Sequence, residues 1–181
     1  MFCREGLDIG TRAFLPHLPR DLGRARLADL GCGNGVLAIA CALANPDAQF
    51  TLVDESYMAV QSARENWQAA LGQREVTIRA ADGLAGQEKQ SLDVVLCNPP
   101  FHQQQVVGDF LAWRMFQQAR EALEVGGALY IVATATWAIT ASWRACSGAS
   151  SRWRQRRSSW CSRPGNKSIA GQVASVRLAP R

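Results

Sequence analysis

Two apolar runs of the sequence meet at the stretch Asp29-Leu30-Gly31-Cys32-Gly33-Asn34-Gly35. This stretch completes the first run, Arg26–Leu30, and begins the second, Gly35–Asn45. The first run has the length of a buried strand. The second is apolar nearly all round, which is typical of a buried helix, and Pro46 marks its end. Glycines at a strand-to-helix turn let the backbone approach a ligand closely and adopt φ values closed to other residues. The stretch therefore predicts a ligand-binding turn in an α/β sheet.

Strand and helix signals alternate after this turn. Further strands are expected at Gln49–Val53, Glu75–Arg79, Asp93–Cys97 and Ala128–Ala133, and helices from Ser56 to about Leu71 and from Val106 to Glu124. We expect Gly126-Gly127 to end the second of these helices. Five strands with right-handed helical crossovers predict a doubly wound, mostly parallel α/β sheet of the Rossmann-like type.

Residues 134–181 differ in composition from the preceding part of the chain. They hold 9 Lys/Arg and no acid, whereas residues 1–133 hold 11 Lys/Arg and 15 Asp/Glu. This Ser-, Arg- and Trp-rich tail has no helical or strand period. One permitted back-translation of residues 134–166, read one base out of register, encodes a helix-like segment, a strand-like segment and a stop. We therefore predict a folded domain at 1–133 and a disordered, frameshift-derived tail at 134–181, with the C-terminal strands missing or disrupted.

Composition also narrows the class of protein. Charged residues make up 19% and apolar residues 48% of the chain, which is typical of a globular domain. No apolar run reaches the roughly 18 residues of a membrane span. Six cysteines without a C-x-x-C pair, and two histidines, offer little for a zinc site. We expect a cytoplasmic monomer with free thiols, no metal and no membrane association.

The spacing of the glycines bears on the cofactor. Gly31, Gly33 and Gly35 form G-x-G-x-G, whereas the dinucleotide fingerprint G-x-G-x-x-G needs glycine at the position of Val36. A pyrophosphate is best bound at an open helix N-terminus, and S-adenosylmethionine has no phosphate. The three glycines are therefore predicted to bind S-adenosylmethionine rather than NAD.

Three acids at or just after the ends of the predicted strands are candidates for the other cofactor contacts. Asp29 is placed to contact the amino-acid moiety, and Asp54 to accept both ribose hydroxyls. Asp82 is placed to accept from the adenine amino group. The alternatives are a solvated loop acid for Asp54 and an ordinary Asp-Gly turn for Asp82.

Asn98-Pro99-Pro100-Phe101 follows the fourth predicted strand directly and indicates the chemistry. An exocyclic amine is a poor nucleophile because its lone pair is delocalised into the ring. The Asn98 side-chain oxygen and the Pro99 carbonyl can accept its two N–H groups and redirect the lone pair toward a methyl carbon. Pro99 and Pro100 stiffen this geometry, and Phe101 offers a face for stacking the target base. The four residues predict N-methylation, and the alternative is a plain Asn-Pro turn.

These motifs, with Val53-Asp54-Glu55-Ser56 and the continuation His102-Gln103-Gln104, resemble class I methyltransferases of the small domain group over about residues 2–133. The resemblance is strongest to enzymes that make N2-methylguanine in 23S ribosomal RNA. The opening segment Arg4–Arg12 is similar to the family segment that helps close the cofactor pocket. The resemblance implies an S-adenosylmethionine-dependent enzyme with large-subunit ribosomal RNA as its partner.

Members of that family also carry an N-terminal domain that helps hold RNA, and two more strands, one antiparallel, at the end of the sheet. The resemblance implies that this chain lacks the first, and its tail is not expected to supply the second. Three alternatives stay open: methylation of a protein glutamine, methylation of adenine N6 in DNA, and a non-catalytic fragment that binds RNA through its Arg/Trp tail.

Overall fold

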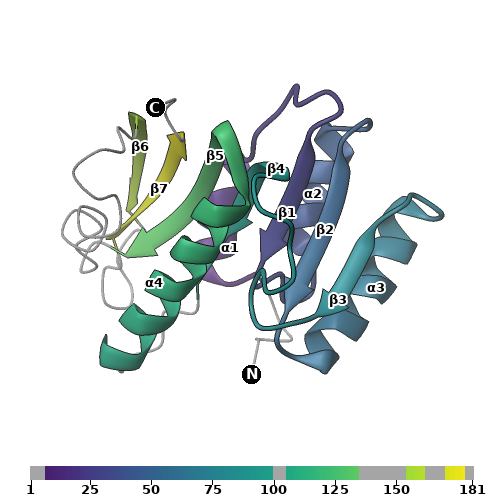
Figure 1. Ribbon diagram of the computed structural model, residues 1–181, viewed down its shortest axis with the longest axis horizontal. Coiled ribbons are helices and arrows are strands. Elements are labelled where there is room, and N and C mark those ends of the chain that lie inside the picture. The colour runs from purple at the N-terminus through teal and green to yellow at the C-terminus, as the bar shows by residue number, and fades with distance from the viewer. Residues whose placement is uncertain (1–6, 100–104, 135–153, 162–169, 178–181) are drawn as a thin grey trace.

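The computed structural model describes residues 7–99, 105–134, 154–161 and 170–177. Seven strands form one sheet in the order β3-β2-β1-β4-β5-β7-β6 (Figure 1). Their bounds are β1 Arg26–Leu30, β2 Gln49–Asp54, β3 Thr77–Ala80, β4 Leu92–Cys97, β5 Leu123–Thr134, β6 Arg154–Cys161 and β7 Ala170–Arg177. Strands β1 to β5 pair in parallel, and β7 runs antiparallel to both of its neighbours. The predicted doubly wound, mostly parallel sheet is confirmed.

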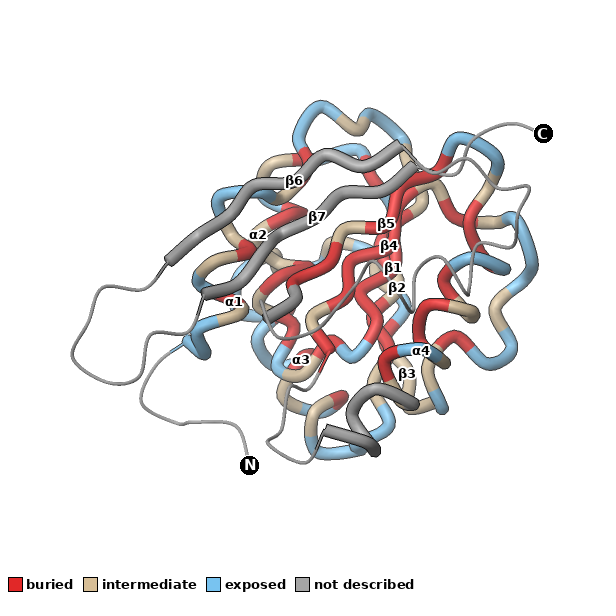
Figure 2. The backbone as a smooth tube through the Cα atoms, turned by 90° about the vertical axis from the view of Figure 1, so that its left-hand side faces the viewer, coloured by how far each residue is buried: buried red, intermediate tan, exposed pale blue. Residues whose placement is uncertain are grey.

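Helices cover both faces of the sheet. The helices are α1 Ile9–Phe14, α2 Val36–Ala44, α3 Tyr57–Leu71 and α4 Gln105–Ala122. Helices α1, α2 and α3 pack on one face through side chains such as Phe14, Leu37 and Trp67. Helix α4 packs on the other face through Met115 and Phe116. The central strands therefore lie between two apolar layers, and they form the buried middle of the molecule in Figure 2.

Local signals fix the helix ends next to the sheet. Ser56 caps α3, as predicted, and its hydroxyl oxygen accepts the backbone N–H of Ala59 at 3.4 Å. The carbonyls at and beyond the end of α2 are bound by Arg74, whose guanidinium donates to Ala42, Asn45 and Ala48 at 2.6–2.8 Å. A cation at a helix C-terminus also complements the helix dipole.

The expected boundary between α4 and β5 is wrong. Helix α4 ends at Ala122 and β5 begins at Leu123, so the Gly126-Gly127 pair lies inside the strand. The β4–β5 register shifts between Leu92 and Val94, and Gly126 has φ +88° at this irregularity. Leu123 is fully buried. Pairing and burial at the start of β5 therefore override the local helix-stop signal of the two glycines.

The expectation of a disordered tail without strands is also wrong for two segments. The antiparallel pairing of β7 to β5 runs from Ala128↔Arg177 to Thr134↔Gly171, and β6 pairs along the other side of β7. The tail lacks a clean alternating pattern, but strand pairing depends strongly on context, and β5 presents a long edge that needs a partner. The frameshift origin of these residues stays a prediction.

Candidate active site

The carboxyl ends of four strands bring the predicted site residues to one edge of the sheet. Leu30 at the end of β1 lies opposite Val53 of β2 and Cys97 of β4. The next residues along these strands are Gly31, Asp54 and Asn98. Asp54 lies opposite Ala80 of β3, two residues before Asp82. Such an edge is where open α/β sheets bind ligands.

The glycine turn is held close to β2. The backbone N–H groups of Gly31 and Cys32 both donate to the Val53 carbonyl, at 2.9 and 3.0 Å. Gly31, Gly33 and Gly35 all have positive φ, of +73°, +54° and +80°. A Cβ on Gly35 would lie 3.3 Å from both Ala63 and Leu52 side chains. Glycine at 35 is therefore required both by backbone conformation and by the close packing of α2.

Asp29 is a buried acid beneath the first turn of α2. Its Oδ2 accepts the backbone N–H of Ala38 at 3.1 Å, whereas Oδ1 is buried without a partner among the described residues. Burial, with a smaller effect from the charge of Asp54, raises the pKa of Asp29 to about 7 against the opposing effect of the Ala38 hydrogen bond. A buried unpaired carboxylate oxygen is costly, and a cationic ligand group would satisfy it.

Asp54 lies at the centre of the turn rather than free in a loop. Its Oδ2 accepts the Gly33 backbone N–H and its Oδ1 accepts that of Ser56, both at 2.9 Å. These bonds leave further lone pairs on each oxygen for a ligand hydroxyl. The carboxylate thus links β2, the glycine turn and the start of α3.

Asp82 is exposed and held by α4. Its Oδ1 accepts from Arg114 Nη2 at 2.6 Å, and its backbone carbonyl accepts from Gln118 Nε2 at 3.1 Å. A Cβ on Gly83 would come within 1.9 Å of the Gln118 side chain, so the loop lies directly against α4. Sequence reasoning missed Arg114 because only the folded chain brings α4 beside this loop.

Asn98 contacts a helix 87 residues away in sequence. Its Nδ2 donates to Thr11 Oγ1 of α1 at 3.2 Å, and the Thr11 hydroxyl in turn donates to Asp8. Pro99 is buried. Pro100 and Phe101, together with His102, Gln103 and Gln104, lie outside the described residues. The resemblance indicates a role for the opening segment, but the sequence does not predict its contact with Asn98.

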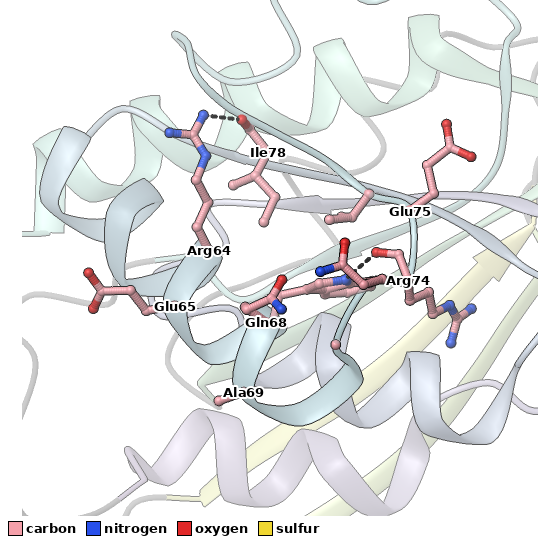
Figure 3. Close-up of a pocket in the computed structure, with 11 residues that line it drawn as sticks. Arg64, Glu65, Gln68, Ala69, Arg74, Glu75 and Ile78 are labelled. Carbon is pink, nitrogen blue, oxygen red and sulfur yellow. Dashed lines mark hydrogen bonds between the residues drawn. The ribbon is translucent and has the colours of Figure 1, made fainter.

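Other features of the described chain offer little chemistry. Cys32, Cys41 and Cys97 are buried, and burial raises the pKa of each thiol, so none of the three forms a thiolate readily. Residues of α3, β3 and the loop between them line a groove, in which Arg64 donates to the Ile78 carbonyl at 2.8 Å (Figure 3). Arg74, from the same loop, binds the end of α2. Within the described residues no group of three metal ligands occurs, and no helix is long and apolar enough to cross a membrane.

The arrangement of a glycine turn, acids at the ends of β1 and β2, and an Asn-Pro step after β4 is that of a methyltransferase domain. The family model "Methyltransferase small domain" matches residues 1–147, and the chain belongs to this family. The chain is 89% identical over 132 residues to Ribosomal RNA large subunit methyltransferase G of Pseudomonas entomophila. It is 80% identical over the same length to the protein of that name from Pseudomonas aeruginosa.

These matches cover 73% of this chain and 35% of each relative, so the chain spans about a third of the length of the curated relatives it matches. Solved structures share the fold. A predicted O-methyltransferase from Agrobacterium tumefaciens superposes with a TM-score of 0.72 at 23% identity, over 93% of this chain and 80% of that one. The T. thermophilus 16S rRNA N2 methyltransferase, in complex with AdoMet and guanosine, superposes with a TM-score of 0.69 at 19% identity, over 97% of this chain and 44% of that one.

Proposed function

We propose that this domain transfers a methyl group from S-adenosylmethionine to the exocyclic N2 of a guanine in 23S ribosomal RNA. The observation that carries the proposal is the position of Asn98 beside the glycine turn, at the same sheet edge as Asp29 and Asp54. The high identity to relatives named as large-subunit ribosomal RNA methyltransferases supports the choice of substrate.

The described residues fit the cofactor. Asp29 has a buried Oδ1 without a partner in the described part of the chain, and this oxygen suits the cationic amino group of S-adenosylmethionine. Asp54 can accept the ribose hydroxyls beside its two backbone bonds. Asp82, held in place by Arg114, can accept from the adenine amino group. Gly31, Gly33 and Gly35 supply the open backbone between these acids.

The bound cofactor would supply an electrophilic methyl carbon on a sulfonium, whose sulfur would keep the electron pair of the broken S–CH₃ bond and leave as a neutral thioether. Asn98 Oδ1 and the Pro99 carbonyl would accept the two hydrogens of the guanine amino group and direct its lone pair toward that carbon. Pro100 and Phe101 complete the tetrapeptide in this proposal, with Phe101 stacking on the base. The amine loses its proton to solvent after attack, so no strong base is needed beforehand.

Cofactor binding is tested by calorimetry on the 181-residue chain and on Asp54→Ala, with Glu55→Ala as control because Glu55 is the exposed neighbouring acid. We expect S-adenosylmethionine to bind the parent and the control, and to bind Asp54→Ala at least tenfold more weakly. Equal binding by all three proteins, or none by a folded parent, would contradict the proposed site.

The target is tested with radiolabelled S-adenosylmethionine offered with 23S rRNA, 16S rRNA, DNA or protein, followed by digestion and mass spectrometry of the product. N2-methylguanosine in 23S rRNA is the expected result. N6-methyladenine or methylated glutamine would identify one of the alternative substrates. Salt-sensitive RNA binding without methyl transfer, lost on removing residues 134–181, would instead favour an RNA-binding fragment.

A further inference from the structure

Three polar groups form a directed hydrogen-bond chain that ends on Asn98. Asp8 is the N-cap residue of α1, and its Oδ1 accepts the Thr11 backbone N–H at 3.0 Å. Its Oδ2 accepts the Thr11 hydroxyl, and Thr11 Oγ1 accepts from Asn98 Nδ2 at 3.2 Å. The chain therefore runs from the Asn98 amide through the Thr11 hydroxyl to the Asp8 carboxylate.

The direction of this chain fixes which end of the Asn98 amide faces Thr11. A hydroxyl has one proton, and the Thr11 proton goes to an acceptor-only carboxylate. Thr11 Oγ1 can therefore act only as a hydrogen-bond acceptor toward its other neighbour, Asn98. A flipped amide would place the Asn98 oxygen against those lone pairs, so Asn98 must present Nδ2 to Thr11.

The same geometry leaves the amide oxygen beside a residue without a side chain. A Cβ on Gly10 would lie 2.8 Å from Asn98 Oδ1, closer than real Cβ contacts allow. Glycine at position 10 therefore gives Oδ1 its room. With Nδ2 bound to Thr11, Oδ1 remains the acceptor for a ligand N–H.

The chain is anchored in the folded core. Thr11 is buried at 4% exposure, and Phe14, one turn later in α1, is fully buried. Hydrogen bonds in series polarise one another, and a carboxylate at the far end strengthens the acceptor character of each oxygen before it. Donation from the Asn98 N–H to Thr11 leaves more electron density on the amide nitrogen and, by resonance, on Oδ1, which makes Oδ1 a better acceptor.

We propose that Thr11 and Asp8 are positioning residues that hold the Asn98 amide with Oδ1 turned toward the substrate amine. The inference rests on the proposed function for the identity of that amine. It assigns a role in methyl transfer to the opening segment, distinct from closing the cofactor pocket. Neither residue contacts the reacting atoms.

The kinetic test compares Thr11→Val, which replaces the hydroxyl with a methyl group, with Thr11→Ser, which keeps it. Thr77→Val is the control, because Thr77 is exposed on β3, at the far edge of the sheet from β5. Single-turnover methyl transfer to 23S rRNA should fall about 10- to 100-fold in Thr11→Val. Thr11→Ser and Thr77→Val should keep the parent rate, and the Kd for S-adenosylmethionine should differ from that of the parent by less than about threefold in all three variants.

A second measurement does not depend on activity. In ¹⁵N-labelled chain, the Asn98 side-chain NH₂ signals, identified by their loss in Asn98→Ala, should exchange slowly with solvent in the parent and in Thr11→Ser. They should exchange fast in Thr11→Val. Gly10→Ala should shift these signals by displacing the amide, without removing the Thr11 hydroxyl.

The two measurements separate the failure of each proposal. A folded parent that transfers no methyl group contradicts the proposed function, and the exchange data then decide the positioning of Asn98 alone. Equal exchange and equal rates in parent and Thr11→Val would overturn the inference. Equal losses in Thr11→Val and Thr11→Ser would assign Thr11 to packing and would overturn it as well.

Discussion

The carboxylate of Asp29 accepts the backbone N–H of Ala38 at 3.1 Å and is otherwise enclosed at the end of β1. One oxygen thus completes the first turn of α2, and the other is buried without a partner among the described residues. A charge in this position is disfavoured by burial and favoured by a bound cation. If Asp29 binds the cofactor as proposed, its protonation links the stability of the domain to cofactor binding.

S-adenosylmethionine affinity should depend on pH through this acid. The pKa of Asp29 is about 7, and the ionised form suits the cofactor ammonium, so binding below pH 7 must first remove the proton. We expect Kd to weaken by up to about tenfold per pH unit below 7, and to weaken again above about pH 8, where the α-amino group itself loses its charge. Calorimetry from pH 5.5 to 8.5, in buffers of different ionisation enthalpy, measures both Kd and proton release.

The matched variants for this prediction are Asp29→Asn and Glu55→Gln, one buried acid and one exposed acid. Asp29→Asn should bind more weakly and lose the acid limb of the profile. Glu55→Gln should reproduce the parent curve. An unchanged acid limb in Asp29→Asn would assign the pH dependence to another group.

Stability without cofactor should change in the opposite direction. The pKa of Asp29 is raised in the folded chain, so the unfolded chain loses its proton first as the pH rises from 4 to 7. The contribution of Asp29 to the free energy of unfolding is therefore greatest below pH 4 and is lost by pH 7. The loss amounts to up to a few kcal/mol, since each unit of difference between the folded and unfolded pKa corresponds to about 1.4 kcal/mol. As the pH rises over this range, the free energy of unfolding of Asp29→Asn, measured in urea, should increase relative to that of the parent. A constant difference between the two proteins would contradict the raised pKa.

Gly35→Ala should destabilise the domain strongly. Its φ of +80° strains any residue with a Cβ, and the new methyl would press on Ala63 and Leu52 at 3.3 Å. We expect a loss of about 2–4 kcal/mol in the free energy of unfolding. Gly23→Ala is the control, since Gly23 also has positive φ (+56°) but nothing within 4 Å of the added carbon, and about 1 kcal/mol is expected. Equal losses would show that packing against α3 is unimportant.

Arg114→Met should weaken cofactor binding without unfolding the domain. Arg114 holds the Asp82 carboxylate at 2.6 Å, and this pair is partly exposed, so its contribution to stability is small. A carboxylate released from α4 is less well placed for the adenine amino group, and we expect Kd to rise about three- to tenfold. Arg120→Met on the same helix controls for charge. An unchanged Kd in Arg114→Met would separate Asp82 from the cofactor site.

Removal of residues 135–181 should expose the edge of β5. The strand pairs with β7 over seven positions, from Ala128 to Thr134, and loses that partner on truncation. We expect lower soluble yield, a lower melting temperature and aggregation. A chain with its reading frame restored after residue 133 should be more stable than the parent, and independent sequencing of the gene tests the frameshift directly. An intact frame in several reads would contradict that origin, and equal stability of the two full chains would contradict the expected gain in stability.

Much of the fold follows from local patterns. Strand β1 and the cap of α3 at Ser56 lie where apolar periodicity and capping chemistry place them. The start of β5 does not, because a buried Leu123 paired to β4 outweighs the two glycines that follow it. Strands β6 and β7 have no clear period of their own, so their place depends on the edge that β5 presents.

The sequence by itself determined the class of site, because glycine spacing, acids after strands and an Asn-Pro step are local chemical signals. Tertiary structure alone decided the partners of those residues: Arg114 beside Asp82, and Thr11 beside Asn98 across 87 positions. It also decided the ionisation of Asp29, which depends on burial beneath α2. Contacts between distant segments and the exclusion of water arise from packing, and no local pattern encodes them.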